Sequence, residues 1–450
     1  MIISKVEKDS SGKSYLVVDG QPFLYNTVQS WYPPEKDFTE YVKMTAKLEY
    51  KCFTFWLYWN FIEPAEGVYD FKEIDKVIDL AVQYDIRLDF LWSGTFFCDH
   101  LDPRWAPGWV FNDKKYHLKD EKGESLVVNG FDMGNCPAAD PCNEELFEKE
   151  KQCTIALMDH LYEYDKTHRV ILIQIQNEIN LQGYYGGKTN VLQYINRLAK
   201  AIKESKYSIA TRVNIAFSEM DSEIDALEYV DGHGVDIYTM DVGISRASML
   251  DPRNTRFKYI AENSAYVNST AHIAAALASG GFYNIFMLTY DYVWKKPGIY
   301  TSDWKQTPIS SKIRDFNVAM NKIGPLIAKA PKENMADFNN ETNKQPFYDY
   351  KQRKMLGGEK IGMMCRESDA VGLIVYDDGT YFCVADSDAY FMILNKDMIC
   401  EVGYMSNNEW IKTGDKLVEK CKVAKYNNDY VVSYSVGECL KINVKNQNNY

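Results

Sequence analysis

The sequence predicts an α/β fold, a (β/α)8 TIM barrel followed by a small all-β domain. Three observations predict it: apolar segments of strand length alternate with amphipathic helical segments, eight such strands can be counted, and the alternation stops near residue 330. Strands that are apolar on both faces and separated by helices form parallel sheets, and eight such units close into a barrel. No G-x-G-x-x-G follows the first strand, which disfavours an open doubly wound sheet.

Each barrel strand is predicted from a run of aliphatic, β-branched or aromatic residues. PFLYNTV (22–28), CFTFWLYW (52–59) and VDIYTM (235–240) are three of these runs. The eight predicted strands begin, in chain order, near Pro22, Cys52, Arg87, Val170, Val213, Val235, Arg256 and Tyr283.

The helices are predicted from apolar residues three and four positions apart. After the second strand the spacing is followed by Ile74, Val77, Ile78 and Ala81. A last helix carries one apolar stripe, made by Ile313, Phe316, Met320, Ile323 and Ile327. Further helices are expected over residues 38–50, 144–164, 190–203 and 269–279.

The composition changes beyond the barrel. KAPKENMADFNNETNKQP is polar and Asn-rich, and short alternating strands such as AVGLIVY and YVVSYSV follow it. We therefore predict a barrel domain over residues 1–330 and a β-sandwich-like domain over residues 331–450. Three roles of the second domain stay open: packing on the barrel, pairing with the amino-terminal strand, or assembly into a homo-oligomer.

Composition and charge exclude several classes of protein. With 46% hydrophobic and 25% charged residues, the chain has no apolar run near the roughly 18 residues of a membrane span. The net charge of −12 disfavours nucleic-acid binding, which depends on clustered Lys and Arg. MIISKVEKDSSGK, at the amino terminus, lacks signal-peptide features. We expect a cytoplasmic protein that binds neither nucleic acid nor membrane.

The ten cysteines lack the dense spacing of a disulfide scaffold, so reduced and mostly buried thiols are expected. One cluster, Cys98, His100, Cys136 and Cys142, could form a metal knot, but it matches no tight zinc pattern such as C-x2-C. The six histidines contain no H-x-H or H-E-x-x-H, which disfavours a metal-dependent hydrolase. We expect no metal and, without a phosphate-binding or redox loop, no organic cofactor.

Two strands end in a carboxylate. RVILIQIQNEIN places Glu178 after the fourth strand, and RFKYIAENSAY places Glu262 after the seventh. A lone Glu at a loop start is often a helix cap or an ion-pair partner. Side chains at the carboxyl ends of barrel strands, however, share one pocket, and two carboxylates facing one bond are what glycoside hydrolysis requires.

These residues lie within a wider resemblance. FWLYWNFIEPAEGVYDFKEIDKVIDLA (55–81) resembles the second strand and loop of glycoside hydrolase family 35 β-galactosidases and their clan A relatives, including family 42, which carry W-N-x-x-E-P-x-x-G-x-Y-D-F there. LVVDGQPF, ILIQIQNEI and GVDIYTMD fit the same template at the first, fourth and sixth strands. The resemblance covers about residues 15–325.

The resemblance implies a role for each matching residue. Glu178 becomes the general acid/base and Glu262 the nucleophile, while Asn177 is expected to bind the sugar 2-hydroxyl and Tyr238 to orient the nucleophile. Glu219 after the fifth strand and Asp241 after the sixth compete for the nucleophile role. In the resembling family the Asn and Glu of W-N-x-x-E-P shape the pocket wall, and here they are Asn60 and Glu63.

Four tryptophans lie at or just past strand ends, where an indole can stack on a pyranose. They are Trp31, Trp59, Trp92 and Trp294. Core packing is the alternative for each, and the resemblance favours a sugar platform at Trp294.

The chain departs from family 35 after the third strand, where WSGTFFCDHLDPRW replaces the galactose-binding run. Asp99 and His100 therefore become candidates to contact a different sugar.

We thus expect a retaining, exo-acting, β-galactosidase-like glycoside hydrolase that acts on short oligosaccharides or glycosides. Two alternatives stay open: a clan A glycosidase for a glucoside, mannoside, fucoside or arabinoside, and a barrel that binds carbohydrate without catalysis.

Overall fold

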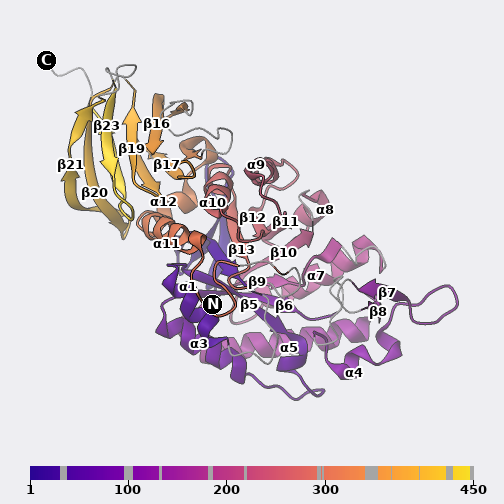
Figure 1. Ribbon diagram of the computed structural model, residues 1–450. Helices are drawn as coiled ribbons and strands as arrows, with labels where there is room; N and C mark the ends of the chain where they lie inside the picture. Colours follow the sequence, from indigo (N-terminus) through magenta and orange to yellow (C-terminus); the bar gives the residue numbers. More distant parts are fainter. Residues whose placement is uncertain are drawn as a thin grey trace.

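The computed structural model describes most of the chain. The described residues are 1–30, 38–95, 105–130, 134–180, 186–216, 220–290, 295, 298–339, 353–365, 367–394, 396–421 and 429–445. Figure 1 shows a barrel joined to a sheet-rich region, with the last helices of the barrel between them.

The barrel is closed and parallel, as the sequence predicts. Its strands lie in the cyclic order β10-β11-β12-β13-β4-β5-β6-β9, so neighbours in the chain are neighbours in the barrel. In chain order they are β4 Asn26–Gln29, β5 Cys52–Tyr58, β6 Arg87–Ser93, β9 Val170–Ile175, β10 Ala210–Ala216, β11 Gly232–Asp236, β12 Phe257–Glu262 and β13 Phe282–Phe286. Strand β9 is therefore the fourth and β12 the seventh.

Two predicted strands differ from the observed ones. Residues 22–28 do not form one strand, because β3 (Gln21–Phe23) pairs antiparallel outside the barrel and only β4 enters it. The sixth strand, predicted to run to Met240, ends at Asp236 because the chain turns at Tyr238, where φ is +38°. The turn is what brings Tyr238 over the end of the barrel.

The helices alternate with the strands. They are α1 Thr39–Lys47, α2 Trp59–Ile62, α3 Lys72–Gln83, α4 Gly108–Phe111, α5 Glu144–Tyr164, α7 Lys188–Lys203, α8 Ser222–Asp225, α9 Val242–Leu250, α10 Ser269–Ala278, α11 Pro308–Asn321 and α12 Gly324–Lys329. All four residues of the predicted stripe on α3 are buried. The predicted last helix is broken between α11 and α12, since Pro325 cannot donate to the turn before it.

A three-stranded sheet packs near the amino-terminal end of the barrel. It contains β1 (Ser4–Lys8), β2 (Ser14–Val18) and β3. The backbone amide of Ile3 donates to Ser208 O at 2.9 Å, just before β10, and β2 contacts β12.

The carboxyl-terminal part is all β. A six-stranded sheet has the order β14-β17-β18-β24-β20-β21, and a five-stranded sheet the order β15-β16-β19-β23-β22. Their bounds are β14 Met335–Phe338, β15 Arg353–Leu356, β16 Glu359–Cys365, β17 Gly372–Asp377, β18 Thr380–Ala385, β19 Ala389–Ile393, β20 Met398–Ser406, β21 Glu409–Lys416, β22 Val418–Lys420, β23 Tyr430–Tyr434 and β24 Leu440–Val444. The elements between are the 3-10 turns η1 Lys114–Tyr116 and η2 Lys332–Asn334 and the hairpin β7 Val127–Gly130 and β8 Gly134–Pro137.

The β region packs on the barrel helices, which was one of its three predicted roles. Strand β14 contacts α10, and β18 contacts α11 (Figure 1). Arg246 on α9 binds the carboxylate of Asp337 on β14 at 2.9 and 2.7 Å, and Thr270 on α10 donates to Asp386 at 2.7 Å. Polar contacts thus join the two regions as well as apolar ones.

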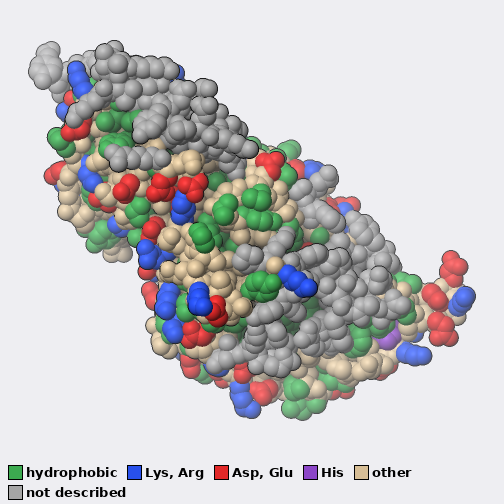
Figure 2. All heavy atoms as spheres, in the orientation of Figure 1, with side chains coloured by type: hydrophobic (Ala, Val, Ile, Leu, Met, Phe, Trp, Pro, Cys, Tyr) green, Lys and Arg blue, Asp and Glu red, His purple; other side chains and the backbone are tan. Residues whose placement is uncertain are grey.

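Charges of both signs are interspersed over the described part of the face in Figure 2. Among the described helices, none is long and apolar enough to cross a membrane.

Candidate active site

Three carboxyl groups meet at the carboxyl end of the barrel. Glu262 is the last residue of β12, Asp236 is the last of β11, and Glu178 follows β9 by three residues. Their side chains are only 3%, 2% and 6% exposed. The carboxyl group of Asp236 lies close enough to both glutamates to interact with them electrostatically. The structure therefore brings the two predicted catalytic residues together, around an aspartate.

Burial, with the nearby charges of Glu262 and Glu178, raises the pKa of Asp236 well above its usual range. The cluster therefore keeps a proton at pH values where an exposed aspartate has lost it.

Tyr238 lies against Glu262. Its hydroxyl donates to Glu262 Oε2, and its ring remains 41% exposed. The next residue is held by Asn263, whose side chain accepts from the amide of Thr239 at 2.9 Å and donates to its carbonyl at 3.1 Å. The residue after the predicted nucleophile thus fixes the turn that carries Tyr238.

Asn214 on β10 organises the loop after β9. Its Oδ1 accepts from the backbone amide of Glu178 at 2.9 Å, while its Nδ2 donates to Asn177 Oδ1 at 3.1 Å and to Asp236 Oδ2 at 2.9 Å. Gln176 and Glu178 both have positive φ, a conformation that is strained in residues other than glycine. Contacts to Asn214 hold Glu178 in this conformation.

A buried ion pair inside the barrel supports Asn214 from below. Arg212 and Asp89 are both 0% exposed and joined at 2.6 Å, and Tyr25 also donates to Asp89 at 2.7 Å. Arg212 also donates to the side chain of Gln174, which in turn donates to Asn214 Oδ1 at 2.7 Å. Separating the two partners of a buried ion pair leaves each charge uncompensated. We therefore expect the series of polar contacts from Asp89 to Asn214 to be rigid.

Two predicted sugar platforms lie in the core. Trp59 and Trp92 are 0% and 1% exposed, and neither presents a face to a sugar here. The indole of Trp59 donates to Glu63 at 2.8 Å, and that of Trp92 donates to Glu150 at 2.8 Å. Their burial favours core packing, the alternative to sugar stacking, for both residues.

Asn60 lies within α2, and Glu63 is the residue that follows this helix. Glu63 is buried and also accepts from the amide of Gly67 at 2.8 Å, which closes the loop after α2. Asn60 is partly buried and its amide donates to Trp105 O at 3.1 Å.

Several predicted residues lie outside the described residues: Trp31, Cys98, Asp99, His100, Glu219 and Trp294. Asp241 is described and caps α9, accepting from the amide of Gly243 at 2.8 Å. Cys136 and Cys142 are free thiols, and the described residues contain no cluster of three or more potential metal ligands.

The sequence reasoning missed Asp236, Asn214 and Glu150. Glu150 accepts from Trp92, Gln176 and Tyr194, and burial raises its pKa to about 7. A signal existed for the first two: each is a polar residue in an otherwise apolar barrel strand, VNIAF or GVDIY. Glu150 gives no such signal, because an acidic residue in a helix is ordinarily solvated.

The sequence matches one family model, that of glycoside hydrolase family 42, described as β-galactosidase, over residues 27–214. The match includes Asn177 and Glu178 and ends before Asp236 and Glu262. No protein of curated function matches significantly.

Solved structures of glycosidases share the fold. A β-galactosidase of Bacillus circulans sp. alkalophilus aligns with TM-score 0.55 and 13% identity over 69% of this chain and 58% of its own. A β-galactosidase of Rahnella sp. R3 aligns with TM-score 0.52 and 12% identity over 68% of this chain and 57% of its own. The exo-β-1,4-mannosidase Op5Man5 of Opitutaceae bacterium strain TAV5 aligns with TM-score 0.50 and 13% identity over 69% of this chain and 62% of its own. The chain thus spans about three fifths of their length.

Of the two families that the motifs indicate, family 42 is the one matched. The predicted resemblance to the barrel glycoside hydrolases of clan A is confirmed, with the family match over residues 27–214 and the fold over about two thirds of the chain.

Proposed function

We propose that the protein is a retaining β-glycoside hydrolase in which Glu262 is the nucleophile and Glu178 the general acid/base. The observation that carries this proposal is the buried meeting of these two carboxyl groups at the ends of the fourth and seventh strands, with Tyr238 donating to Glu262. The family match and the glycosidase folds support the same reaction class.

The surroundings of the two glutamates favour different tasks. Glu262 accepts a hydrogen bond from Tyr238, which stabilises the ionised form that attacks the anomeric carbon. Glu178 lies beside Asp236 in a buried cluster that retains a proton, and a proton is what the donor to the leaving oxygen must supply. After the glycosyl-enzyme forms, the same group takes a proton from water.

For the glycone, the sugar that is released, we propose a preference and a set of alternatives. A β-galactoside is favoured by the matched family, and a β-mannoside, glucoside, fucoside or arabinoside is the alternative. We propose exo-action on short oligosaccharides, since the sequence carries a long insertion, residues 93–143, between the third strand and the helix that follows it. Internal fragments released from a long glycan would contradict exo-action.

The test is hydrolysis of a panel of aryl β-glycosides by wild type and Glu262→Ala, with and without azide. A retaining enzyme loses turnover in the variant, and azide restores it as the inverted glycosyl azide. Asp241→Asn is the matched control, because it changes an acid at the same face whose side chain caps a helix. Wild-type silence across the panel, with an intact fold and sugar binding, would support the carbohydrate-binding alternative instead.

A further inference from the structure

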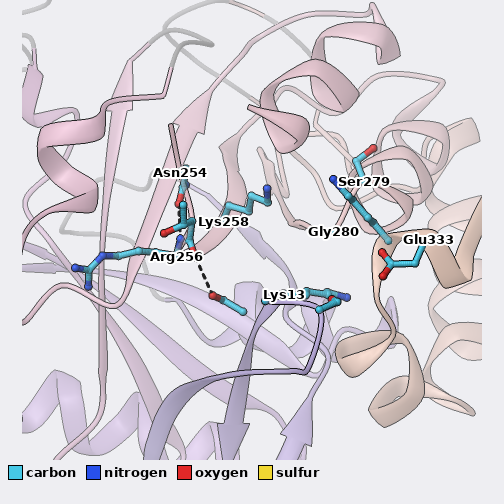
Figure 3. Close-up of a pocket in the computed structure, with 12 residues that line it drawn as sticks. Lys13, Asn254, Arg256, Lys258, Ser279, Gly280 and Glu333 are labelled. Carbon is cyan, nitrogen blue, oxygen red and sulfur yellow. Dashed lines mark hydrogen bonds between the residues drawn. The ribbon is translucent and has the colours of Figure 1, made fainter. Parts of the chain in front are cut away.

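A second polar pocket lies on the opposite face of the barrel from the carboxylates. It encloses about 130 Å³ and is lined by four segments: residues 11–14 between β1 and β2, residues 254–258 leading into β12, residues 279–280 before β13, and residues 332–333 in η2. Figure 3 shows these segments converging, with Lys258 extending between the loop of Arg256 and the turn of Gly280. Its volume suits a few water molecules or one small ligand.

The lining is strongly basic. It contains Lys13, Arg256, Lys258 and Lys332, against one carboxylate, Glu333. Burial lowers the pKa of Lys258, and the charge of Lys332 lowers it further, while Asp251 and Asp225 raise it. Burial also lowers the pKa of Lys13, which Asp9 raises and Lys258 lowers. The net shift of both lysines is downward, so the nearby carboxylates do not fully compensate the desolvated ammonium groups.

Two of the four cations have acceptors in the wall. Arg256 donates to Asp225 O and Val230 O, both at 2.7 Å. Lys13 donates to Ile327 O at 3.2 Å and Ala330 O at 2.8 Å. These contacts join the barrel loops to the end of α12 and fix the shape of the pocket.

Lys258 and Lys332 are different. Within the described ranges neither has a hydrogen-bond acceptor, and no carboxylate lies within 4 Å of either ammonium, Glu333 included. Other polar groups of the wall are already engaged: Ser14 donates to Thr255 O at 3.3 Å, and Asn254 donates to His233 O at 3.0 Å. The pocket therefore offers donors that its own walls leave unused.

We propose that this pocket binds a small oxyanion of the phosphate type, with Lys258 and Lys332 as its charge partners. The anion is either inorganic phosphate or the phosphate group of a small metabolite. Three or four oxygens would satisfy both ammonium groups and neutralise the repulsion between them. The site is independent of the proposed glycosidase site, since it lies at the start of β12 while Glu262 lies at its end.

The first experiment is calorimetric titration of the full chain with inorganic phosphate, with sodium chloride used to hold ionic strength constant. We expect saturable binding to wild type and at least tenfold weaker binding to Lys258→Met/Lys332→Met. Lys5→Met/Lys8→Met is the matched control, since it removes two exposed lysines of β1 and should bind like wild type. If the double variant does not fold, Lys332→Gln alone, at an exposed residue, tests the same contact.

The outcomes separate cleanly. Equal responses to phosphate and to chloride would mean ionic screening only, and phosphate binding that persists in the double variant would place the anion elsewhere; either result overturns the proposal. A second arm uses glucose 6-phosphate. Tighter binding than inorganic phosphate identifies a phosphorylated metabolite as the ligand, and equal or weaker binding identifies the free anion.

Discussion

The two ends of the barrel concentrate opposite charges in different ways. At the carboxyl end, three acids are buried together and share hydrogen bonds with Asn214 and Tyr238. At the amino end, lysines converge on a pocket whose walls bind only some of them. Strand β12 connects the two, with Lys258 near its start and Glu262 at its end. The cluster that we propose to be catalytic is thus hydrogen-bonded to its own surroundings, whereas two lysines of the proposed anion site are not.

The largest expected effect tests the acidic end. Glu178→Gln should lower kcat/KM by about 10²–10⁴-fold for glycosides whose leaving group needs a proton, because the general acid is lost. Aryl glycosides with acidic phenols should lose much less. The measurement is kcat/KM across leaving groups of graded pKa. An equal loss for all of them would contradict an acid role for Glu178.

Asp236→Asn sharpens the comparison by removing the third acid without changing the shape of the side chain. If the cluster has the proposed catalytic role, kcat should fall by about 10–100-fold and the basic limb of the pH–rate profile should move to lower pH. The sign follows because burial and the charges of Glu262 and Glu178 raise the pKa of Asp236, so the cluster as a whole holds a proton to higher pH; an amide at this position removes that titrating group, and the cluster then loses its proton at lower pH. A slower enzyme with an unchanged profile would assign Asp236 a purely structural role.

Much of this layout could be predicted from the sequence. Continuous apolar runs gave the strands, and Glu178 and Glu262 stood out because each follows such a run. Asp236 did not stand out, because the predicted strand extended to Met240 and its actual end at Asp236 was therefore not recognised.

The basic pocket could not be predicted, because its lysines come from segments up to 319 residues apart, between Lys13 and Lys332. Only tertiary folding brings them together. Likewise, Trp59 and Trp92 follow the pattern of strand-end aromatics, and burial was decided by the helices that cover them.

Lys13→Met tests how the burial of Lys13 affects the pH dependence of folding stability. Burial lowers the pKa of Lys13 from 10.5 to about 7. Between these values the unfolded chain binds a proton that the folded chain does not, so this lysine makes the folded state more stable as pH rises.

In Lys13→Met this rise of stability with pH should be lost. The difference in free energy of unfolding between wild type and variant should therefore change by on the order of 1–2 kcal/mol between pH 7 and 9. Urea unfolding at the two pH values measures it, with exposed Lys8→Met as the control. If the difference in free energy of unfolding between wild type and variant is the same at both pH values, Lys13 stays charged in the folded protein.

The smallest effect concerns repulsion between Lys258 and Lys332. Lys332→Gln should stabilise the protein by about 0.2–1 kcal/mol at low salt, because Lys258 loses a like-charged neighbour. The gain should vanish in about 1 M salt, where the Debye length is about 3 Å. Thermal unfolding at both salt concentrations checks this, with Lys72→Gln as an exposed control. Destabilisation at low salt would indicate that Lys332 has an attractive partner.

The polar chain from Asp89 through Arg212 and Gln174 to Asn214 has a consequence for engineering. It supports the acidic cluster from inside the barrel, and the loop after β6 adds contacts from Gly94 and Thr95 to Gln176. Libraries that exchange the loop after β13, or the loop after β6 beyond Thr95, should therefore retain the proposed reaction centre while sampling new sugars. Libraries that vary the strand interiors should yield mostly inactive clones.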